Sequence, residues 1–246
     1  MVGASLINSM ENTKVIILAG GLGTRLRQTL GTLPKPLAPI GNKSFLDYLL
    51  EFISHQGFRD VIISLGYGSD AIKESLGDGS SRGLRIAYTL ERELLGTAGA
   101  VKLSELVIGS DDFFIMNGDT YFEVDLKHML RFHESRNAVA TIAMAYKADT
   151  GRYGDIFIDK DNEVVSFSEK AGEGRAGYIN GGIYIFRKEV LQYIPANKAC
   201  SLEKEIIPFL VGKGLYGFPV KGYFIDIGIP EDYEKAKREI PLRRLV

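Results

Sequence analysis

The sequence predicts an α/β protein whose core is a twisted, mostly parallel sheet with helices on both faces. Between residues 15 and 146, apolar β-branched runs alternate with amphipathic stretches. The run Val15–Ala19 is continuously apolar and is followed by two glycines, which is typical of a strand buried on both faces. Ser44, with Asp47 three residues later and Gly57 after the last apolar position, predicts a capped helix over 44–56.

The same alternation predicts the remaining elements in order. In the first half we expect strands at 60–65, 85–90, 113–116 and 139–146, and helices at 70–76, 98–106 and 126–133. The pattern then changes, because the apolar runs 156–159 and 164–167 flank a polar turn and predict a β-hairpin. Beyond it we expect a strand at 182–186, helices at 188–193 and 202–210, strand segments within 216–227 and a closing helix at 230–240. We interpret this second half as a substrate-shaping lobe added to the same sheet.

Composition limits the organisation of the chain and excludes several classes of protein. A length of 246 residues with 45% hydrophobic residues predicts a single domain over 14–240, preceded by a disordered extension over 1–13. The 30 basic residues nearly cancel the 31 acidic ones, so no net charge attracts nucleic acid or an anionic membrane. Cys200 is the only cysteine, which excludes an internal disulfide and a thiolate metal cage. No apolar run reaches the roughly 20 residues that span a bilayer, and no signal-peptide pattern is present, so we expect a cytoplasmic protein.

A glycine-rich, basic segment directly after the first strand indicates an anion site. In an open parallel sheet, ligands bind beyond the carboxyl ends of the strands. Gly20, Gly21 and Gly23 let backbone N–H groups approach anionic oxygens closely. Arg25 offers a fork of donors that matches phosphate, and Lys35 adds a second cation between two stiff prolines. Without these two cations, a tight turn that happens to contain glycines would explain the segment equally well.

Two familiar phosphate motifs do not fit this segment. The pattern G-x-x-x-x-G-K-[ST] is absent, and Leu26 stands where the dinucleotide pattern G-x-G-x-x-G needs its third glycine, which argues against a dinucleotide-dependent oxidoreductase. Instead, Gly20-Gly21-Leu22-Gly23-Thr24-Arg25-Leu26 with Pro34-Lys35-Pro36 resembles the signature of the sugar-phosphate nucleotidyltransferases, or nucleotide-sugar pyrophosphorylases. The resemblance extends over almost the whole chain, although Gln28 stands where the family often has proline.

The resemblance implies a fold and a reaction. The fold is the GT-A-like nucleotidyltransferase fold, a Rossmann-like mixed sheet with a small β-rich sugar-binding lobe. Residues 14–125 would then form the nucleotide-binding half and residues 126–240 the sugar-binding half. The reaction converts an NTP and a sugar 1-phosphate into an NDP-sugar and pyrophosphate. Arg25 is expected to hold the β- and γ-phosphates, and Lys35 to stabilise charge at the reacting α-phosphate. The nucleotide-binding residues implied by the resemblance are Leu18, Ala19, Gly20, Gly21, Gly23, Thr24, Arg25, Lys35, Glu93, Gly96, Thr97 and Gly118.

Two carboxylates are candidates for a Mg²⁺ site. Asp119 follows the apolar run 113–116, so we expect it just past the carboxyl end of a strand, near the glycine-rich segment. Asp226 lies within an apolar segment, where a buried carboxylate requires a cation nearby. From the residues alone, a turn explains Asp119 better and a structural ion pair explains Asp226 equally well. In the family both positions carry Mg²⁺ ligands, so the resemblance implies Mg²⁺ as a cofactor.

The residues of the sugar side are assigned by resemblance alone. The family has a Glu-Lys pair at Glu169 and Lys170, with the acid on the sugar hydroxyls and the lysine as a catalytic cation on the sugar phosphate. Spacing by itself suggests only a solvated strand edge there. Gly154, Asn180 and Gly181 match segments that line the sugar pocket of the family.

The base cannot be identified from the sequence. Leu94 stands where the family usually has proline, and Ala98 where glycine is common, so the segment that holds base and ribose departs from the usual pattern. A guanine needs an acceptor for its N–H groups. Glu91, Glu93 or a backbone carbonyl would serve.

The sugar-side segments nevertheless favour one branch of the family. Segments 152–154, 178–184 and 225–233 are most similar to those of D-glycero-α-D-manno-heptose 1-phosphate guanylyltransferases. This implies GTP as the NTP, and GDP-heptose for bacterial surface glycans such as lipopolysaccharide or an S-layer glycan. N-acetylmuramate 1-phosphate uridylyltransferases and mannose 1-phosphate guanylyltransferases share the core signature and stay open as alternatives. A non-catalytic regulatory subunit is an alternative of another class, but it would be expected to lose Lys35, Asp119 or Asp226, and all three are present. Whether the chain forms a homo-oligomer is left open.

Overall fold

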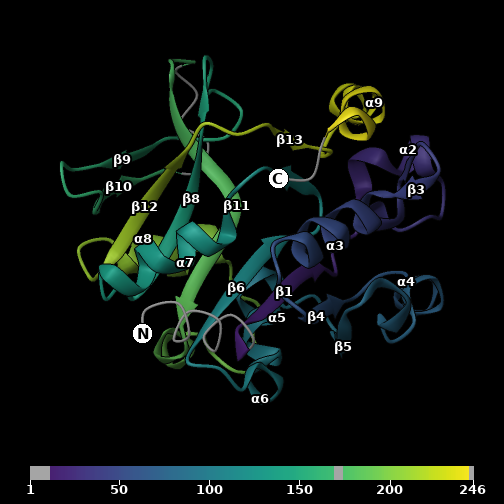
Figure 1. The fold of residues 1–246 in the computed structure, drawn as a ribbon, viewed down its shortest axis with the longest axis horizontal. Coiled ribbons are helices and arrows are strands. Elements are labelled where there is room, and N and C mark those ends of the chain that lie inside the picture. Colours follow the sequence, from purple (N-terminus) through teal and green to yellow (C-terminus); the bar gives the residue numbers. More distant parts are fainter. Residues whose placement is uncertain (1–11, 169–173, 244–246) are drawn as a thin grey trace.

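The computed structural model describes residues 12–168 and 174–243, and within these ranges nine strands form one mixed sheet (Figure 1). The strand β1 (Lys14–Ala19) pairs in parallel with β4 (Asp60–Leu65) on one side and with β6 (Asp112–Asn117) on the other. At the edge, β5 (Arg85–Leu90) lies parallel to β4. These four strands form the parallel half of the sheet that the alternating pattern predicts.

The second half of the chain joins this sheet through an antiparallel strand. One edge of β11 (Gly177–Arg187) pairs with β6, and the other pairs with β8 (Ala140–Lys147). In turn, β8 lies parallel to β12 (Leu215–Val220). The predicted hairpin is present as β9 (Ile156–Ile158) and β10 (Val164–Phe167), and it attaches near the start of β11. The predicted α/β fold is therefore confirmed, with the second lobe on the same sheet.

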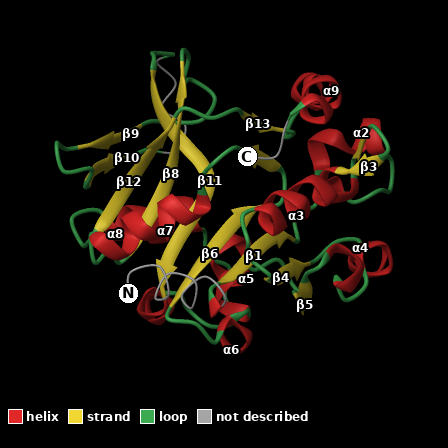
Figure 2. Cartoon of the chain, viewed as in Figure 1, coloured by secondary structure: helices red, strands yellow, loops and turns green. Residues whose placement is uncertain are grey.

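Helices cover both faces of the sheet, and each face has its own apolar core (Figure 2). Along β1, Val15 and Ile17 belong to one core and Ile16 to the other, as expected for a strand buried on both faces. The helices are α2 (Arg27–Leu30), α3 (Phe45–His55), α4 (Ser69–Leu76), α5 (Gly96–Leu103), α6 (Glu105–Ile108), α7 (Leu126–Ser135), α8 (Ile207–Leu210) and α9 (Pro230–Glu239). The apolar side chains of α3 pack in the first core, and those of α5 pack in the second.

The first turn of α3 has the predicted capping box. The Ser44 hydroxyl accepts the Asp47 N–H at 3.1 Å, and the Asp47 carboxylate accepts the Ser44 N–H at 2.9 Å. Arg82 also donates to Asp47 at 2.8 Å. Burial alone would raise the pKa of Asp47, but the hydrogen bonds from Ser44 and Arg82 outweigh it and hold that pKa below its usual value.

Three predicted helices differ from the structure. The segment expected to be helical at 188–193 is a 3₁₀ helix, Lys188–Tyr193. The helix expected at 98–106 is interrupted at Ser104, whose buried hydroxyl donates to the Ala100 carbonyl at 3.2 Å and contacts the Thr89 hydroxyl at 3.1 Å. Because such a bond competes with the helical ladder, α5 ends there and α6 begins. The helix expected at 202–210 starts with a π-helical turn, Leu202–Ile206, before α8. Pro208 has no N–H to continue an α-helical ladder at this point.

Short elements bring distant segments to the carboxyl ends of the strands. The strands β7 (Thr120–Phe122) and β13 (Phe224–Asp226) form an antiparallel pair that sets Asp226 opposite Thr120, directly after β6. A second pair consists of β2 (Pro39–Ile40) and β3 (Lys43–Ser44). The 3₁₀ turns are Thr24–Leu26, Lys35–Leu37, Ser80–Arg82, Lys188–Tyr193 and Ile240–Leu242.

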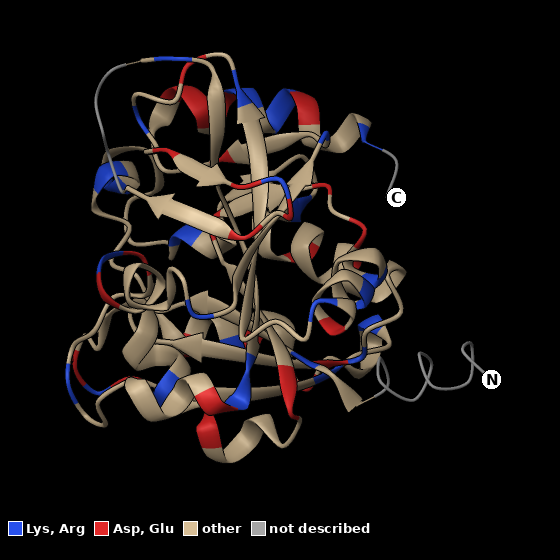
Figure 3. Cartoon of the chain, turned by 90° about the vertical axis from the view of Figure 1, so that its left-hand side faces the viewer, with Lys and Arg blue, Asp and Glu red and all other residues tan. Residues whose placement is uncertain are grey.

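Lys and Arg residues are interspersed with Asp and Glu residues along the elements in Figure 3. This distribution agrees with the near-zero formal net charge of −1. In the part of the chain that the structure describes, no helix has both the length and the apolar character needed to cross a membrane.

Candidate active site

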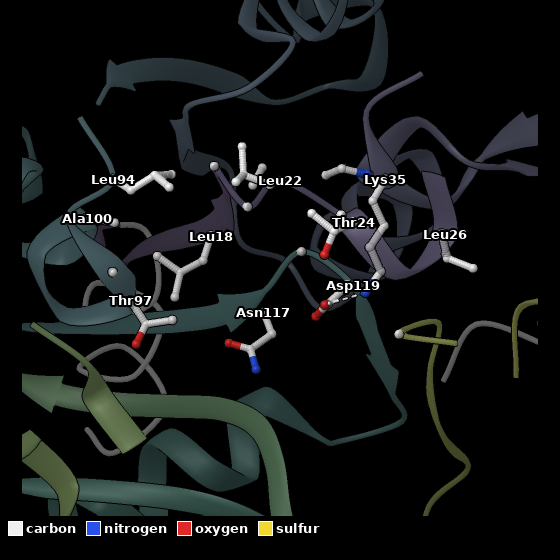
Figure 4. A pocket seen from close by; sticks show the side chains of 18 of the residues that line it. Leu18, Leu22, Thr24, Leu26, Lys35, Leu94, Thr97, Ala100, Asn117 and Asp119 are labelled. Carbon is white, nitrogen blue, oxygen red and sulfur yellow. Dashed lines mark hydrogen bonds and ion pairs between the residues drawn. The ribbon is translucent and has the colours of Figure 1, made fainter. Parts of the chain in front are cut away.

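A cavity of about 590 Å³ opens where β1 and β6 end (Figure 4). Its volume is in the range of roughly 300–1,000 Å³ that is usual for small-molecule sites. The residues that line it are Leu18, Ala19, Gly20, Gly21, Leu22, Gly23, Thr24, Arg25, Leu26, Lys35, Pro36, Glu91, Leu94, Gly96, Thr97, Ala100, Asn117, Gly118, Asp119 and Gly228. Every predicted nucleotide-binding residue except Glu93 is in this set, so the fold gathers segments that are distant in the sequence.

The glycine loop between β1 and the Thr24–Leu26 turn forms one side of the cavity. Gly23 has a φ of +58°, and a Cβ there would lie 3.1 Å from the Cβ of Lys35. Glycine therefore lets the loop pass close over Lys35 in a left-handed conformation. Leu26 is fully buried and anchors the end of the loop, whereas Arg25 is exposed along the cavity.

Lys35, Asp119 and Asp226 converge at one end of the site. The Nζ of Lys35 donates to Asp119 Oδ2 at 2.6 Å (Figure 4). The same nitrogen lies 4.0 Å from Asp226 Oδ1. The Asp226 carboxylate also accepts the N–H of Gly228 at 2.7 Å. Burial, together with the negative charge of Asp119, raises the pKa of Asp226 to about 6, even though Lys35 opposes this shift. Such a shifted carboxylate in a cleft is typical of functional sites.

Gly96 and Thr97, at the start of α5, both line the cavity, and Thr97 lies across it from Lys35 (Figure 4). Gly96 has a φ of +69°, and a Cβ there would lie 2.6 Å from the Cys200 carbonyl oxygen. Only glycine fits this position, because both the backbone conformation and the contact exclude a side chain. The Thr97 hydroxyl donates to the Glu203 carboxylate at 2.8 Å. This bond connects the side of the cavity formed by Gly96 and Thr97 to the Leu202–Ile206 turn.

The two acids considered for the base have different positions. Glu91 lines the cavity, where its carboxylate accepts the Leu95 N–H at 2.9 Å and leaves no room for a Cβ on Gly20. Burial raises the pKa of Glu91. Glu93 is exposed and is not part of the lining. The structure therefore brings Glu91, rather than Glu93, to the cavity.

Of the predicted sugar-side residues, the structure describes Gly154, Asn180 and Gly181, which lie on the second lobe, outside the lining of this cavity. Gly154 has a φ of +89°, and its N–H donates to the Thr150 carbonyl at 3.1 Å, so it forms a turn that requires glycine. Glu169 and Lys170 lie outside the described residues.

Asn180 and Gly181 lie at a bulge of β11, where the register with β8 shifts. The Asn180 amide donates to the Tyr184 hydroxyl at 2.6 Å and accepts the Gly182 N–H at 3.0 Å. A Cβ on Gly181 would lie 2.5 Å from the ring of Phe122. Packing against this ring is a sufficient reason for glycine at 181, so its contact with a sugar stays a prediction.

Comparison with known proteins agrees with this geometry. A family described as "Nucleotidyl transferase" matches residues 14–242. The chain belongs to this family. It is 41% identical over 228 residues to the D-glycero-α-D-manno-heptose 1-phosphate guanylyltransferase of Aneurinibacillus thermoaerophilus, covering 92% of this chain and 98% of the relative. It is 37% identical to the enzyme of the same name from Campylobacter jejuni, covering 89% of this chain and 96% of that one.

A solved structure of the family has the same fold. The crystal structure of HddC from Yersinia pseudotuberculosis complexed with GMP-PN matches with a TM-score of 0.81 at 37% identity, covering 93% of this chain and 99% of that one. The match extends over both halves of the sheet, since nearly the whole of each chain is aligned.

Seven residues that line the cavity were not among the candidate site residues, although some of them belong to the motifs that carry the resemblance. They are Leu22, Leu26, Pro36, Leu94, Ala100, Asn117 and Gly228. Most of them are neighbours of the motif residues, so proximity in the sequence was a usable signal. Gly228 is two residues from Asp226 and donates to its carboxylate. Glu203 had no such signal, because 106 residues separate it from Thr97.

Proposed function

We propose that this chain transfers GMP from GTP to D-glycero-α-D-manno-heptose 1-phosphate and releases pyrophosphate. The observation that carries the proposal is the convergence of Lys35, Asp119 and Asp226 beside a glycine-loop cavity. The heptose 1-phosphate guanylyltransferases of two bacteria, which align with this chain over nearly their whole length, support the choice of substrates. The GMP-PN complex of HddC supports a guanine nucleotide.

In the proposed reaction, an oxygen of the sugar 1-phosphate attacks the α-phosphorus of GTP. A new P–O bond forms, the bond to the β-phosphate oxygen breaks, and pyrophosphate leaves with that electron pair. Arg25 offsets the charge that develops on the leaving group, and Lys35 offsets charge at the α-phosphate. The backbone N–H groups of Gly20–Gly23 hold the remaining phosphate oxygens. No side-chain nucleophile is required, because the sugar phosphate itself attacks.

The residues present fit a Mg²⁺ ion. Mg²⁺ is held by one or two protein carboxylates and keeps several waters. Asp119 and Asp226 both lie within 4.0 Å of one ammonium nitrogen. Burial first, and then the negative charge of Asp119, raise the pKa of Asp226, and a bound cation would offset both effects. We assign both carboxylates as its ligands. When bound, the ion would supply charge neutralisation at the phosphates.

On the sugar side we propose that Gly154, Asn180 and Gly181 contact the heptose, with Glu169 on its hydroxyls and Lys170 on its phosphate. For the base we favour Glu91 as the acceptor of guanine N–H groups, because it lines the cavity and Glu93 does not. The product would serve a bacterial surface glycan such as lipopolysaccharide or an S-layer glycan, and the reaction would take place in the cytoplasm.

The test is a pyrophosphate-release panel. It crosses GTP, UTP, dTTP, CTP and ATP with the 1-phosphates of heptose, mannose, glucose and N-acetylmuramate. We expect GTP with D-glycero-α-D-manno-heptose 1-phosphate to give the highest kcat/KM. A higher value with UTP and N-acetylmuramate 1-phosphate, or with GTP and mannose 1-phosphate, would contradict the substrate assignment. No turnover with any pair would favour a non-catalytic regulatory subunit.

A further inference from the structure

Four side chains from three elements form a hydrogen-bonded chain from the cavity to the second lobe. Thr97 of α5 donates to one oxygen of Glu203 at 2.8 Å, and Tyr184 of β11 donates to the other at 3.3 Å. Asn180, also on β11, donates to the Tyr184 hydroxyl at 2.6 Å. Glu203 thus connects a residue of the predicted nucleotide site with a residue of the predicted sugar site.

The direction of each bond in this chain follows from the chemistry of its members. An ionised carboxylate can only accept, so Thr97 and Tyr184 must both give their hydroxyl protons to Glu203. The Tyr184 oxygen must then accept from Asn180. The Gly182 N–H donates to the Asn180 Oδ1 at 3.0 Å, which also fixes which end of the amide is oxygen. Glu203 therefore sets which atom donates and which accepts in every hydrogen bond of this series.

This orientation decides what each end offers to a ligand. The Thr97 hydroxyl gives its proton to Glu203 and accepts the Leu202 N–H at 2.8 Å, so it retains one lone pair for a ligand donor. Among the contacts of the described residues, the Asn180 amide keeps one N–H for a ligand acceptor. The nucleotide end is thereby an acceptor, and the sugar end is a donor.

Local structure holds Glu203 in place. It lies in the π-helical turn Leu202–Ile206, whose two end residues are buried in the second core. Ser201 caps this turn, and its hydroxyl also donates to Glu203 at 3.0 Å. π-Helical turns are rare and are frequently found at functional sites. Residues four apart in an uninterrupted strand share a face but lie too far from each other to bond. The bulge in β11 shortens this separation, and the Asn180 amide reaches the Tyr184 hydroxyl at 2.6 Å.

We propose that Glu203 is a positioning residue of the two-substrate site. It orients Thr97 as an acceptor toward the nucleotide and, through Tyr184, Asn180 as a donor toward a hydroxyl or ring oxygen of the sugar. This inference rests on the proposed function, because it takes the ligands of Thr97 and Asn180 to be the nucleotide and the sugar 1-phosphate.

The decisive variant is Glu203→Gln, which keeps the shape of the side chain. A glutamine has one acceptor oxygen and an NH₂ group that would face a hydroxyl donor. The hydrogen bonds from Thr97 and Tyr184 therefore cannot both keep their direction. We expect KM to rise about tenfold for both GTP and heptose 1-phosphate, the size expected for losing a hydrogen bond to a charged group. The matched control is Glu205→Gln on the same turn. Its side-chain oxygen can still accept the Ser201 N–H, so both KM values should stay within about twofold.

A second variant distinguishes the effect of Glu203 on the sugar side, through Asn180, from its effect on the nucleotide side, through Thr97. Tyr184→Phe removes the hydroxyl that lies between Glu203 and Asn180, and with it the Tyr184–Glu203 and Asn180–Tyr184 hydrogen bonds, but it preserves the Thr97–Glu203 bond. We expect the KM of the sugar 1-phosphate to rise and that of GTP to stay unchanged. If Glu203→Gln leaves both KM values at the wild-type level, or if it lowers only the melting temperature, the positioning role is wrong.

Equilibrium GTP binding keeps this inference separate from the proposed function. Weaker GTP binding by Glu203→Gln supports the role of Glu203 on the nucleotide side without any turnover. Unchanged GTP binding by that variant overturns it. Absence of turnover in the wild-type chain with every substrate pair contradicts the proposed function instead.

Discussion

Lys35 Nζ lies 2.6 Å from Asp119 Oδ2, although 84 residues separate the two in the sequence. Lys35 reaches this position from the 3₁₀ turn Lys35–Leu37, and Asp119 from the segment that follows β6. Asp226, on β13, approaches the same ammonium at 4.0 Å. One cation therefore faces two carboxylates at the end of the cavity, and its removal would leave their repulsion uncompensated.

Changing Lys35 to alanine should lower kcat strongly. If Lys35 offsets charge at the α-phosphate, its loss is expected to cost about 10²–10³-fold, the usual effect of deleting one preorganised charge or donor. Steady-state kinetics with GTP and heptose 1-phosphate measures it. Lys43→Ala is the control, because Lys43 forms a partly exposed pair with Glu51 that contributes little. Equal activity of the two variants would contradict the role of Lys35.

The two carboxylates should set the metal requirement of the enzyme. We expect chelation to abolish turnover and added Mg²⁺ to restore it. Asp119→Asn and Asp226→Asn should each raise the Mg²⁺ concentration for half-maximal rate by at least about tenfold, because each removes a negative ligand. The control is Asp125→Asn at the start of α7, where asparagine also caps a helix. If both site variants reach half-maximal rate at the same Mg²⁺ concentration as the wild type, these residues are not ligands.

Gly118→Ala should destabilise the junction of β1 and β6. A Cβ at 118 would lie 2.5 Å from the Leu18 carbonyl oxygen, which is backbone and cannot turn away. We expect the free energy of unfolding to fall by about 1–3 kcal/mol. A Cβ on Gly21 would meet nothing within 4 Å, so Gly21→Ala should leave this free energy unchanged. Denaturant titration compares the two variants, and equal stability would refute the packing argument.

Asp47 should contribute a pH-dependent part of the stability. Its pKa in the folded state is held below the usual value near 3.8, so its contribution is complete above that value. It is lost as the pH falls through the lower, folded-state pKa. At about pH 7 we expect Asp47→Asn to be less stable than the wild type by about 1 kcal/mol, the usual size of a capping interaction. Urea titrations at a series of pH values should show this gap closing below about pH 4. A gap that stays constant down to about pH 2 would contradict the assignment.

The strands of the first half were predicted well because each is a continuous apolar run that ends in polar or glycine residues. The bounds 60–65 and 85–90 match β4 and β5. Features that depend on tertiary contacts were missed. Ser104 interrupts a helix because its hydroxyl bonds inside the core, and β11 is longer than expected because glycines at 181 and 182 form a bulge rather than an end.

The sequence by itself determined the alternating α/β fold, the glycine loop with Arg25 and Lys35, and the family to which these residues belong. Each depends on local patterns or on a contiguous motif. Only the tertiary structure decided that Lys35, Asp119 and Asp226 share one point, that Glu91 rather than Glu93 lines the cavity, and that Glu203 connects Thr97 with Asn180. The physical reason is that strand order, and not sequence spacing, sets which chain segments meet at the carboxyl edge of a sheet.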